Sequence, residues 1–318
     1  MCNHLVRFLI FIFLIPLLLT CEKDSPTEPA PSDNLLDPQI ILNQVNLDSL
    51  TRQVAILSGE QPVLIDTSLV TISSRYSHHS GNARAAEYLE QKLLRYDLQV
   101  HMMDFSASGR NVYAVQYGLV DPEQVYIICA HYDSMPDSSI SPGADDDASG
   151  CATVLEAARI LSRYTSRYTI IYAFWDEEEQ GIRGSLAYAS RAAQLNENIR
   201  GVINIDMIGW DSNDDGQFYI NVRDTAQSAQ ISNRMVSLHD QFQVGLSPQV
   251  LNPGSGSDNL AFWRFGFGAV GVEEMYGSDW NAYYHTTNDR LAQFNLDYFY
   301  KCASLCIVSL SSLVEIES

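Results

Sequence analysis

The sequence predicts an α/β domain in which helices cover both faces of a central sheet. Short apolar runs alternate with amphipathic segments, which is typical of consecutive βαβ units. Histidine and acidic residues follow several of the apolar runs, and open α/β sheets bind their ligands beyond the carboxyl ends of the strands. No repeat or second linker interrupts residues 35–318, so we expect this stretch to be one domain.

The expected strands are short runs rich in Val, Ile and aromatic residues: residues 112–116, 125–130, 169–174, 202–205 and 269–272. The expected helices carry apolar side chains at steps of three and four residues: 83–95, 149–163 and 296–313. In the last helix the apolar stripe consists of Phe299, Cys302, Cys306, Leu310 and Leu313. The pattern therefore places helices and strands in alternation along most of the chain.

Residues 1–21 differ in composition from the rest of the chain and indicate an export signal. Arg7 precedes an apolar run at residues 8–19, which is shorter than the roughly 20 residues that a spanning helix needs. The sequence LLTC at residues 18–21 resembles a lipoprotein signal box, which implies that Cys21 is lipidated and becomes the mature N-terminus. We therefore expect an exported lipoprotein of the cell envelope. A plain secretory signal on a soluble secreted or periplasmic protein is the alternative.

Residues 22–34 contain three prolines among Ser, Thr and acidic residues, which predicts a flexible tether. The four cysteines that follow are too few for a disulfide scaffold, so we expect buried free thiols. The 19 Lys and Arg against 39 Asp and Glu give a net charge of −20. This charge argues against nucleic acid or an anionic membrane surface as a partner. A lipid anchor would then be the chain's contact with a membrane.

Potential metal ligands stand at or between the ends of the expected strands. These are His131 after residues 125–130, an acidic run at 176–179 after residues 169–174, and Asp206 after residues 202–205. Three aspartates at 145–147 lie between the first two of these strands, and His285 comes after the last expected strand. Imidazole and carboxylate groups gathered at one edge of a sheet are a zinc-type ligand set.

Five segments carry a resemblance to a known family. In chain order, HYDS, PGADDDASG, FWDEEEQGIRGS, NIDMIG and YHTTND resemble the signature blocks of the di-zinc aminopeptidase family, with bacterial leucyl aminopeptidases as the nearest type. The superfamily also includes glutaminyl cyclases and glutamate carboxypeptidase-like proteins. The resemblance spans about residues 70–310. It implies the zinc-exopeptidase fold, a three-layer α/β/α sandwich with a mixed central sheet.

The resemblance also implies a set of two Zn²⁺ ions per chain and their ligands. His131 and Asp206 would hold one zinc, Glu179 and His285 would hold the other, and Asp146 would bridge them. Carboxylate-rich pairs of sites also accept cobalt or manganese, so the identity of the metal stays open.

Three further acidic residues receive roles around this expected centre. By the same resemblance Glu178 would be the general base that takes a proton from water. Asp133 would orient the imidazole of His131 through its second ring nitrogen. Asp147 is expected to cap the N-terminus of the following helix, because aspartate is favoured at that position.

The function implied by the resemblance is hydrolysis of the N-terminal peptide bond of peptides that have a free N-terminus. A glutaminyl-peptide cyclotransferase, a carboxypeptidase-like relative and an inactive binding protein are the alternatives. The intact set of ligands and base argues against an inactive protein. The close spacing between Glu179 and Gly184-Ser185 favours the aminopeptidase over the cyclases.

Apolar and aromatic residues before His285 are expected to line the substrate pocket, namely Met275, Tyr276, Trp280 and Tyr283. Such a lining favours peptides with an apolar first residue, whereas Glu273 or Glu274 would favour a basic one if either faced the pocket. Gly254 stands where the family has a tyrosine that helps to stabilise the tetrahedral intermediate. The donor to the oxyanion therefore stays open.

Overall fold

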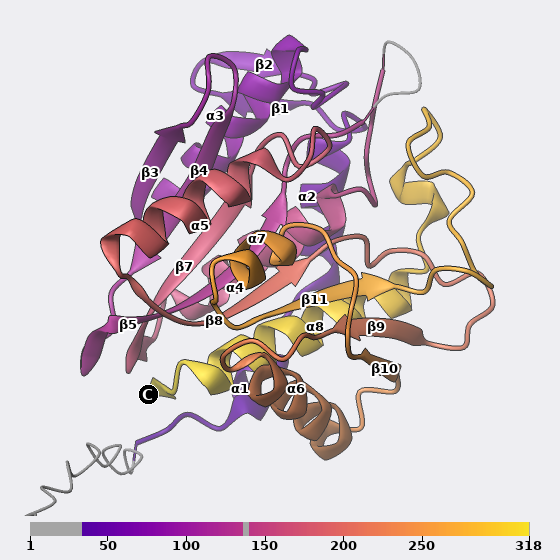
Figure 1. Cartoon of the computed structure of the whole chain (residues 1–318). Coiled ribbons are helices and arrows are strands. Elements are labelled where there is room, and N and C mark those ends of the chain that lie inside the picture. Colours follow the sequence, from indigo (N-terminus) through magenta and orange to yellow (C-terminus); the bar gives the residue numbers. More distant parts are fainter. Residues whose placement is uncertain (1–33, 136–139, 318) are drawn as a thin grey trace, which may run out of the picture. The chain divides into compact units, whose positions relative to one another are not determined.

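A mixed sheet of eight strands forms the middle layer of the fold in the computed structural model, which describes residues 34–135 and 140–317 (Figure 1). From one edge to the other the strands are β10 (Ser247–Leu251), β9 (Gln217–Asn221), β11 (Ala269–Glu274), β8 (Asn198–Ile205), β5 (Asp121–His131), β7 (Tyr168–Trp175), β4 (Arg110–Gln116) and β3 (Gln99–Asp104). Strands β11, β8, β5 and β7 run parallel to one another. Strand β9 is antiparallel to β11, and β4 is antiparallel to both β7 and β3.

Helices cover both faces of this sheet. One face packs against α1 (Pro38–Leu42), α2 (Leu47–Leu57), α3 (Ser80–Leu94), α4 (Ala148–Leu161), α6 (Ser228–Phe242) and α8 (Leu296–Leu313). The other face packs against α5 (Arg183–Leu195) and α7 (Asn259–Arg264), which lie in front of the sheet in Figure 1. Smaller pairs are β1 (Val63–Ile65) with β2 (Ser68–Val70) and β6 (Thr165–Ser166) with β12 (Ile316–Glu317), and a short 3₁₀ helix spans Leu291–Gln293. The predicted three-layer α/β/α fold is confirmed.

The central strands are buried on both faces, which explains their nearly continuous apolar sequences. In β5, Ile128 and Ala130 pack into one core and Ile127 and Cys129 into the other, and all four are fully buried. Parallel strands covered by helices on both sides need apolar residues at every position. The same burial accounts for the expected free thiols, because all four described cysteines are buried and unpaired.

Every strand and helix predicted above overlaps an element of the structure. The predicted helix at 296–313 coincides with α8, and Asp147 caps α4 by accepting a hydrogen bond from the backbone N–H of Gly150 at 2.8 Å. Elements that the sequence did not single out include α2, α5, α6, α7, the edge strands β3 and β10, and β9 next to β10. The expected export signal, Cys21 and residues 22–33 of the expected tether lie outside the described residues. Within the described residues, no helix is both long and apolar enough to cross a membrane.

The packing of α8 leads to a test of the fold. Phe299 is fully buried and meets the ring of Phe294 edge to face, with ring centroids 5.2 Å apart. We expect Phe299→Ala to lower the free energy of unfolding by about 3–5 kcal/mol because it removes a large core side chain and leaves a cavity. Leu296→Ala on the same helix is the control, since Leu296 is 40% exposed and should change stability by about 0.5 kcal/mol or less. Denaturant unfolding of both variants measures the difference, and equal losses would contradict this assignment.

Candidate functional site

The residues expected to bind metal meet at one edge of the central sheet. Because β5, β7, β8 and β11 are parallel, their carboxyl ends point the same way. His131 ends β5, Glu178 and Glu179 follow β7, Asp206 follows β8, and His285 lies in the loop after β11. Asp146 comes from the segment that leads into α4. The chain thus brings together ligands that lie up to 154 residues apart.

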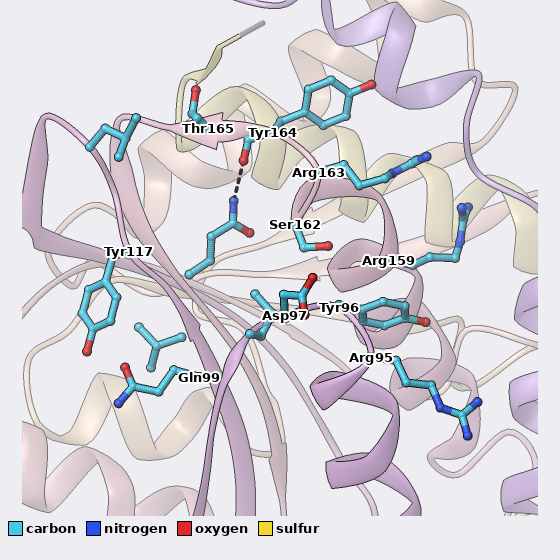
Figure 2. Close-up of a pocket in the computed structure, with 14 residues that line it drawn as sticks. Arg95, Tyr96, Asp97, Gln99, Tyr117, Arg159, Ser162, Arg163, Tyr164 and Thr165 are labelled. Atoms are coloured by element: carbon cyan, nitrogen blue, oxygen red, sulfur yellow. Dashed lines mark hydrogen bonds between the residues drawn. The ribbon is translucent and has the colours of Figure 1, made fainter.

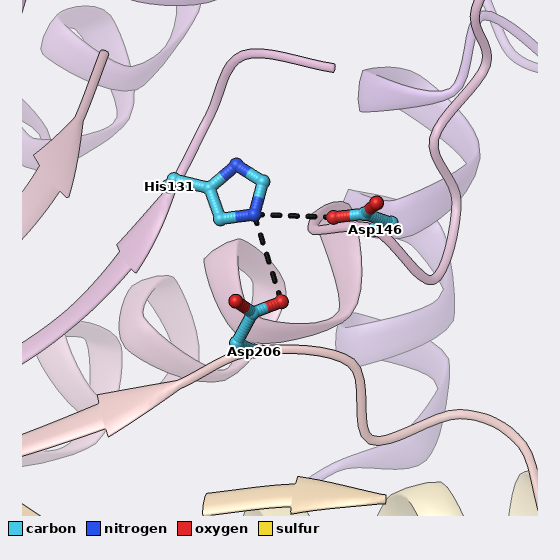
Figure 3. A group of neighbouring side chains, drawn as sticks. All are labelled: His131, Asp146 and Asp206. Atoms are coloured by element: carbon cyan, nitrogen blue, oxygen red, sulfur yellow. Dashed lines mark ion pairs between the residues drawn. The ribbon is translucent and has the colours of Figure 1, made fainter. Parts of the chain in front are cut away.

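The candidate ligands form two groups that share one aspartate. In the first group, Nε2 of His131 lies 3.1 Å from Oδ1 of Asp146 and 3.6 Å from Oδ1 of Asp206 (Figure 3). In the second, Nε2 of His285 lies 3.1 Å from Oδ2 of Asp146 and 3.1 Å from Oε2 of Glu179. Within each group one ligand atom from each side chain lies within 4.8 Å of the others. Asp146 turns one carboxylate oxygen to each group, as a bridging ligand does.

The chemistry of these two groups fits bound cations. Oε1 of Glu179 is buried, yet it makes no hydrogen bond to a described residue. Burial disfavours a charged imidazole, but hydrogen bonds to Asp146 and Glu179 raise the pKa of His285 to about 10. Burial also disfavours ionisation of Asp146, but the two imidazoles lower its pKa below the usual range. The cluster therefore has a field that attracts positive charge, and its imidazole and carboxylate donors suit zinc.

The backbone turns sharply at three of the ligand segments. Glu177, Met207 and His285 have positive φ angles of 58°, 59° and 60°, in the left-handed region that residues other than glycine seldom adopt. Glu177 precedes the Glu178–Glu179 pair and Met207 follows Asp206. Conformations of this kind cluster at functional sites, where the surrounding structure holds them in place.

Asp133 connects the ligand His131 to the segment that carries Glu178 and Glu179. Its Oδ1 lies 3.3 Å from Nδ1 of His131 and accepts a hydrogen bond from the backbone N–H of Glu178 at 3.0 Å. Its Oδ2 accepts from the backbone N–H of Glu179 at 3.2 Å. This fully buried carboxylate is therefore placed both to orient the imidazole and to fix the turn after β7.

Asp147 connects three ligand segments in the same way. One oxygen accepts from the backbone N–H groups of Gly150 at 2.8 Å and Met207 at 3.3 Å, and the other accepts from that of His131 at 3.3 Å. The segment after β11 is tied in by Asp289, whose carboxylate accepts from the backbone N–H groups of the neighbouring residues 145 and 146 at 2.9 and 3.2 Å. These contacts fix the positions of the ligand segments relative to one another.

Glu178 lines a cavity of about 350 Å³ next to both ligand groups. Burial raises the pKa of Glu178 well above its usual range, and the carboxylates of Asp258, Asp206 and Glu179 add to this effect. Glu177, in contrast, is paired with Arg183 at 2.5 Å and accepts a hydrogen bond from Ser108 at 2.9 Å. Glu178 is thus the one of these two neighbours that is available to a molecule in the cavity.

Asp258 is a residue that the sequence did not single out. It is fully buried, neither carboxylate oxygen has a hydrogen-bond partner among the described residues, and burial raises its pKa to about 7. Asp258 occupies the capping position of α7, but its side chain makes no capping hydrogen bond. An aspartate directly before an apolar helix is usually interpreted as a helix cap, so its position in the sequence does not indicate a site residue.

The lining of the cavity includes part of the predicted substrate pocket. The lining residues are Asp146, Glu178, Glu179, Asp206, Met207, Ser255, Gly256, Ser257, Glu273, Tyr276, Trp280 and Tyr284. Of the four residues expected to line the substrate pocket, Tyr276 and Trp280 line this cavity, whereas Met275 and Tyr283 are not part of its lining. If β11 continued, the alternation of side chains along the strand would place Met275 on the same face as Glu273. The strand ends at Glu274, so this alternation does not extend to Met275. The ring of Tyr283 packs against Trp210 instead, with centroids 5.6 Å apart.

A larger hollow of about 850 Å³ lies elsewhere, beside the carboxyl end of α4, the edge strand β3 and its neighbour β4 (Figure 2). Among its arginines, Arg159 is already paired, since it donates to Glu156 at 2.7 Å and to the backbone oxygen of Gln44 at 2.7 Å. Because α4 has 14 residues, the hollow is about 20 Å from the ligands at its other end. The chemistry is therefore placed in the smaller cavity.

Comparison with known proteins agrees with this geometry. The sequence pattern of peptidase family M28 matches residues 111–310, a range that contains all five candidate ligands and Glu178. The chain belongs to peptidase family M28. A probable zinc metalloprotease from Pyrenophora tritici-repentis is 29% identical over 197 residues, which cover 54% of this chain and 41% of that protein. The matched part of the chain thus spans about two-fifths of the length of this curated relative.

Two solved structures have the same fold as this M28 chain. The LapA aminopeptidase of Legionella pneumophila superposes with a TM-score of 0.74 at 18% identity, over 92% of this chain and 78% of that one. A glutaminyl cyclase of Bacteroides thetaiotaomicron superposes with a TM-score of 0.66 at 17% identity, over 84% of this chain and 97% of that one. At these identities the likeness shows the fold, and the two proteins have different activities on it.

The position of Asp133 leads to a test of the site. We expect Asp133→Asn to weaken Zn²⁺ binding by about 10- to 100-fold, because it loosens the orientation of the ligating imidazole of His131. Asp240→Asn is the matched control, since Asp240 forms an Asp–His pair outside the ligand groups, with Nδ1 of His239 at 2.9 Å on an exposed face. Titration against a competing chelator measures both affinities. Equal affinities in the two variants would show that Asp133 does not act on the metal site.

Proposed function

We propose that this protein is a zinc-dependent aminopeptidase that removes the first residue of peptides with a free N-terminus. The observation that carries the proposal is the pair of ligand groups that share Asp146 on the wall of the cavity that Glu178 also lines. Membership of peptidase family M28 and the zinc metalloprotease relative support the zinc peptidase part of this proposal. The aminopeptidase part is supported by the fold shared with LapA and by a site built for two ions.

The five ligand side chains would hold two zinc ions, with His131 and Asp206 on one, Glu179 and His285 on the other, and Asp146 between them. Zinc, when bound, polarises the scissile carbonyl and makes water acidic enough to lose a proton near neutral pH. Glu178 accepts that proton on its carboxylate and returns it to the nitrogen of the leaving amine. Asp133 holds Glu178 in position through the backbone N–H at 3.0 Å.

Tyr284 is the residue of the cavity best placed to stabilise the developing oxyanion. Gly254 has no side chain with which to do so, and the Tyr276 hydroxyl already donates to Glu273 at 2.5 Å. Tyr284 lines the cavity, and its ring stacks on that of the ligand His285 with centroids 3.6 Å apart. Its ring therefore lies on the same wall of the cavity as the second ligand group.

A glutaminyl cyclase is the second candidate, because one solved neighbour with this fold is such an enzyme. A cyclase uses the substrate's own amine as the nucleophile and releases ammonia, whereas the aminopeptidase activates water. The shared set of two ligand groups and the short connection from Glu179 to Gly184-Ser185 favour water as the nucleophile.

Export as a lipoprotein anchored through Cys21 remains part of the proposal on the sequence alone.

A product assay by mass tests the proposed reaction. We expect peptides that begin with a free residue to lose that residue, and N-acetylated versions to react at least about tenfold more slowly, a difference of roughly 1.4 kcal/mol in activation free energy. A free α-amine is part of the binding geometry at a two-ion site, so blocking it removes an interaction. Loss of ammonia alone from a peptide that begins with Gln would instead identify a cyclase. Release from the carboxyl end would identify a carboxypeptidase.

The role of Glu178 has its own test. We expect Glu178→Gln to retain about two zinc ions per chain, measured by elemental analysis, and to lose about 10²- to 10⁴-fold in kcat, because the general base is gone while the ligands remain. Glu177→Gln is the matched control at the preceding position, where the carboxylate pairs with Arg183 and does not line the cavity. Its kcat should stay near that of the unaltered protein. An active Glu178→Gln variant would remove Glu178 from the mechanism.

A further inference from the structure

The cavity beside the ligand groups contains one buried carboxylate that the proposed mechanism does not use. Glu273 is 1% exposed, lies on β11 and lines the cavity, whereas its neighbour Glu274 turns away and accepts a hydrogen bond from the backbone N–H of Trp210 at 2.8 Å. Successive side chains of a strand point to opposite faces, which explains why only one of the two reaches the cavity. Glu273 is therefore placed to contact whatever fills this space.

Glu273 is held in a defined orientation by two hydrogen bonds to the same oxygen. Its Oε2 accepts from Nδ2 of Asn221 at 2.7 Å and from the hydroxyl of Tyr276 at 2.5 Å. Its other oxygen, Oε1, receives neither of these two hydrogen bonds. Two donors on one side fix the carboxylate and leave the second oxygen for a ligand in the cavity.

Aromatic rings continue from Glu273 toward the mouth of the cavity. The ring of Tyr276 lies 5.5 Å from that of Tyr219 and 5.9 Å from that of Trp280, and Trp280 lies 4.9 Å from Tyr284. Trp280 is 47% exposed, so this end of the row meets solvent. Aromatic faces bind both alkyl chains and cations. A wall of this kind suits a long side chain that ends in a positive charge.

The charges around the cavity favour a cation at Glu273. Among the described residues that line it there is no Lys, Arg or His, and the carboxylates of Asp146, Glu179 and Asp206 are the expected metal ligands. Glu273 is thus left without a counter-ion of its own. Burial, with the nearby Asp206, raises its pKa to about 8, so an unpaired charge is costly there and a cation would relieve that cost. An apolar side chain would leave Oε1 buried and unpaired.

We propose that Glu273 selects substrates whose first residue is lysine or arginine, by pairing Oε1 with the ammonium or guanidinium group while the aromatic row contacts the alkyl chain. This inference rests on the proposed aminopeptidase function and names its substrate class. Of the preferences that the sequence left open, an apolar or a basic first residue, the cavity favours the basic one. A role for Glu273 in binding the substrate's α-ammonium group is the competing explanation, because that group is common to every substrate.

Fluorogenic amides of lysine and norleucine separate these explanations, because the two side chains have the same number of carbon atoms and differ in the terminal ammonium group. We expect kcat/KM for the lysine amide to exceed that for the norleucine amide at least tenfold in the unaltered protein. Glu273→Gln keeps an oxygen for Asn221 and Tyr276 but removes the charge, and we expect it to lower the lysine-to-norleucine ratio at least tenfold. Glu273→Asp keeps the charge and should retain part of the preference.

Asp297→Asn is the control for the change in net charge, since Asp297 is an exposed residue on α8 that pairs with Lys301. Its lysine-to-norleucine ratio should equal that of the unaltered protein. An unchanged lysine-to-norleucine ratio in Glu273→Gln would overturn the inference. If kcat/KM also falls equally for both substrates, Glu273 is assigned to the α-ammonium group instead. If neither amide is cleaved by the unaltered protein, the proposed function itself fails.

A measurement on the unaltered protein decides the matter if the Glu273 variants do not fold. Lysinamide and norleucinamide carry the same α-ammonium group, so competitive inhibition of leucine amide hydrolysis compares only their side chains. We expect the inhibition constant of lysinamide to be at least tenfold lower than that of norleucinamide. Equal constants, or tighter binding of norleucinamide, would overturn the inference while leaving the aminopeptidase function standing.

Discussion

Hydrogen bonds from backbone N–H groups to buried carboxylates are the interactions on which the site depends. Asp133, Asp147 and Asp289 are each at most 2% exposed, and each accepts from the backbone of a ligand segment other than its own. Each such bond lowers the cost of placing a carboxylate in a buried position, because the N–H dipole partly replaces water. The sheet brings the strand ends to one edge, and these carboxylates then set the distances between the ligands.

This arrangement gathers negative charge in a place where water is largely excluded. Burial raises the pKa of Asp147, Glu178 and Asp289 well above the usual range, which means that the ionised cluster is unfavourable by itself. Bound cations would offset that cost, and binding would then be coupled to the stability of this edge of the fold. The left-handed turn at His285 belongs to the same edge and is held by the structure around it.

The sequence predicted the parts of the site that follow directly from strand periodicity. His131 and Asp206 stand at or next to the ends of apolar strands, so their meeting at one sheet edge could be foreseen from the parallel order of those strands. The pocket could be foreseen only in part, because residues 275–284 form an irregular segment that turns at Gly277, where φ is 87°. Which aromatic residue faces the cavity there is decided by tertiary packing, and no local pattern records it. Asp258 was missed for the related reason that its burial depends on contacts with distant segments.

The hydrogen bond between Asn221 and Glu273 joins β9 to β11 and involves none of the ligand segments. Asn221 ends an antiparallel strand near the edge of the sheet, while His131 and Asp146 are held from the middle of the sheet and from α4. Under the proposed role of Glu273, substitutions at positions 221 and 273 would alter which side chain the cavity accepts while leaving all five metal-ligand side chains in the sequence unchanged. In evolutionary terms, such a separation would allow substrate preference to diverge among related proteins while selection conserves the metal ligands.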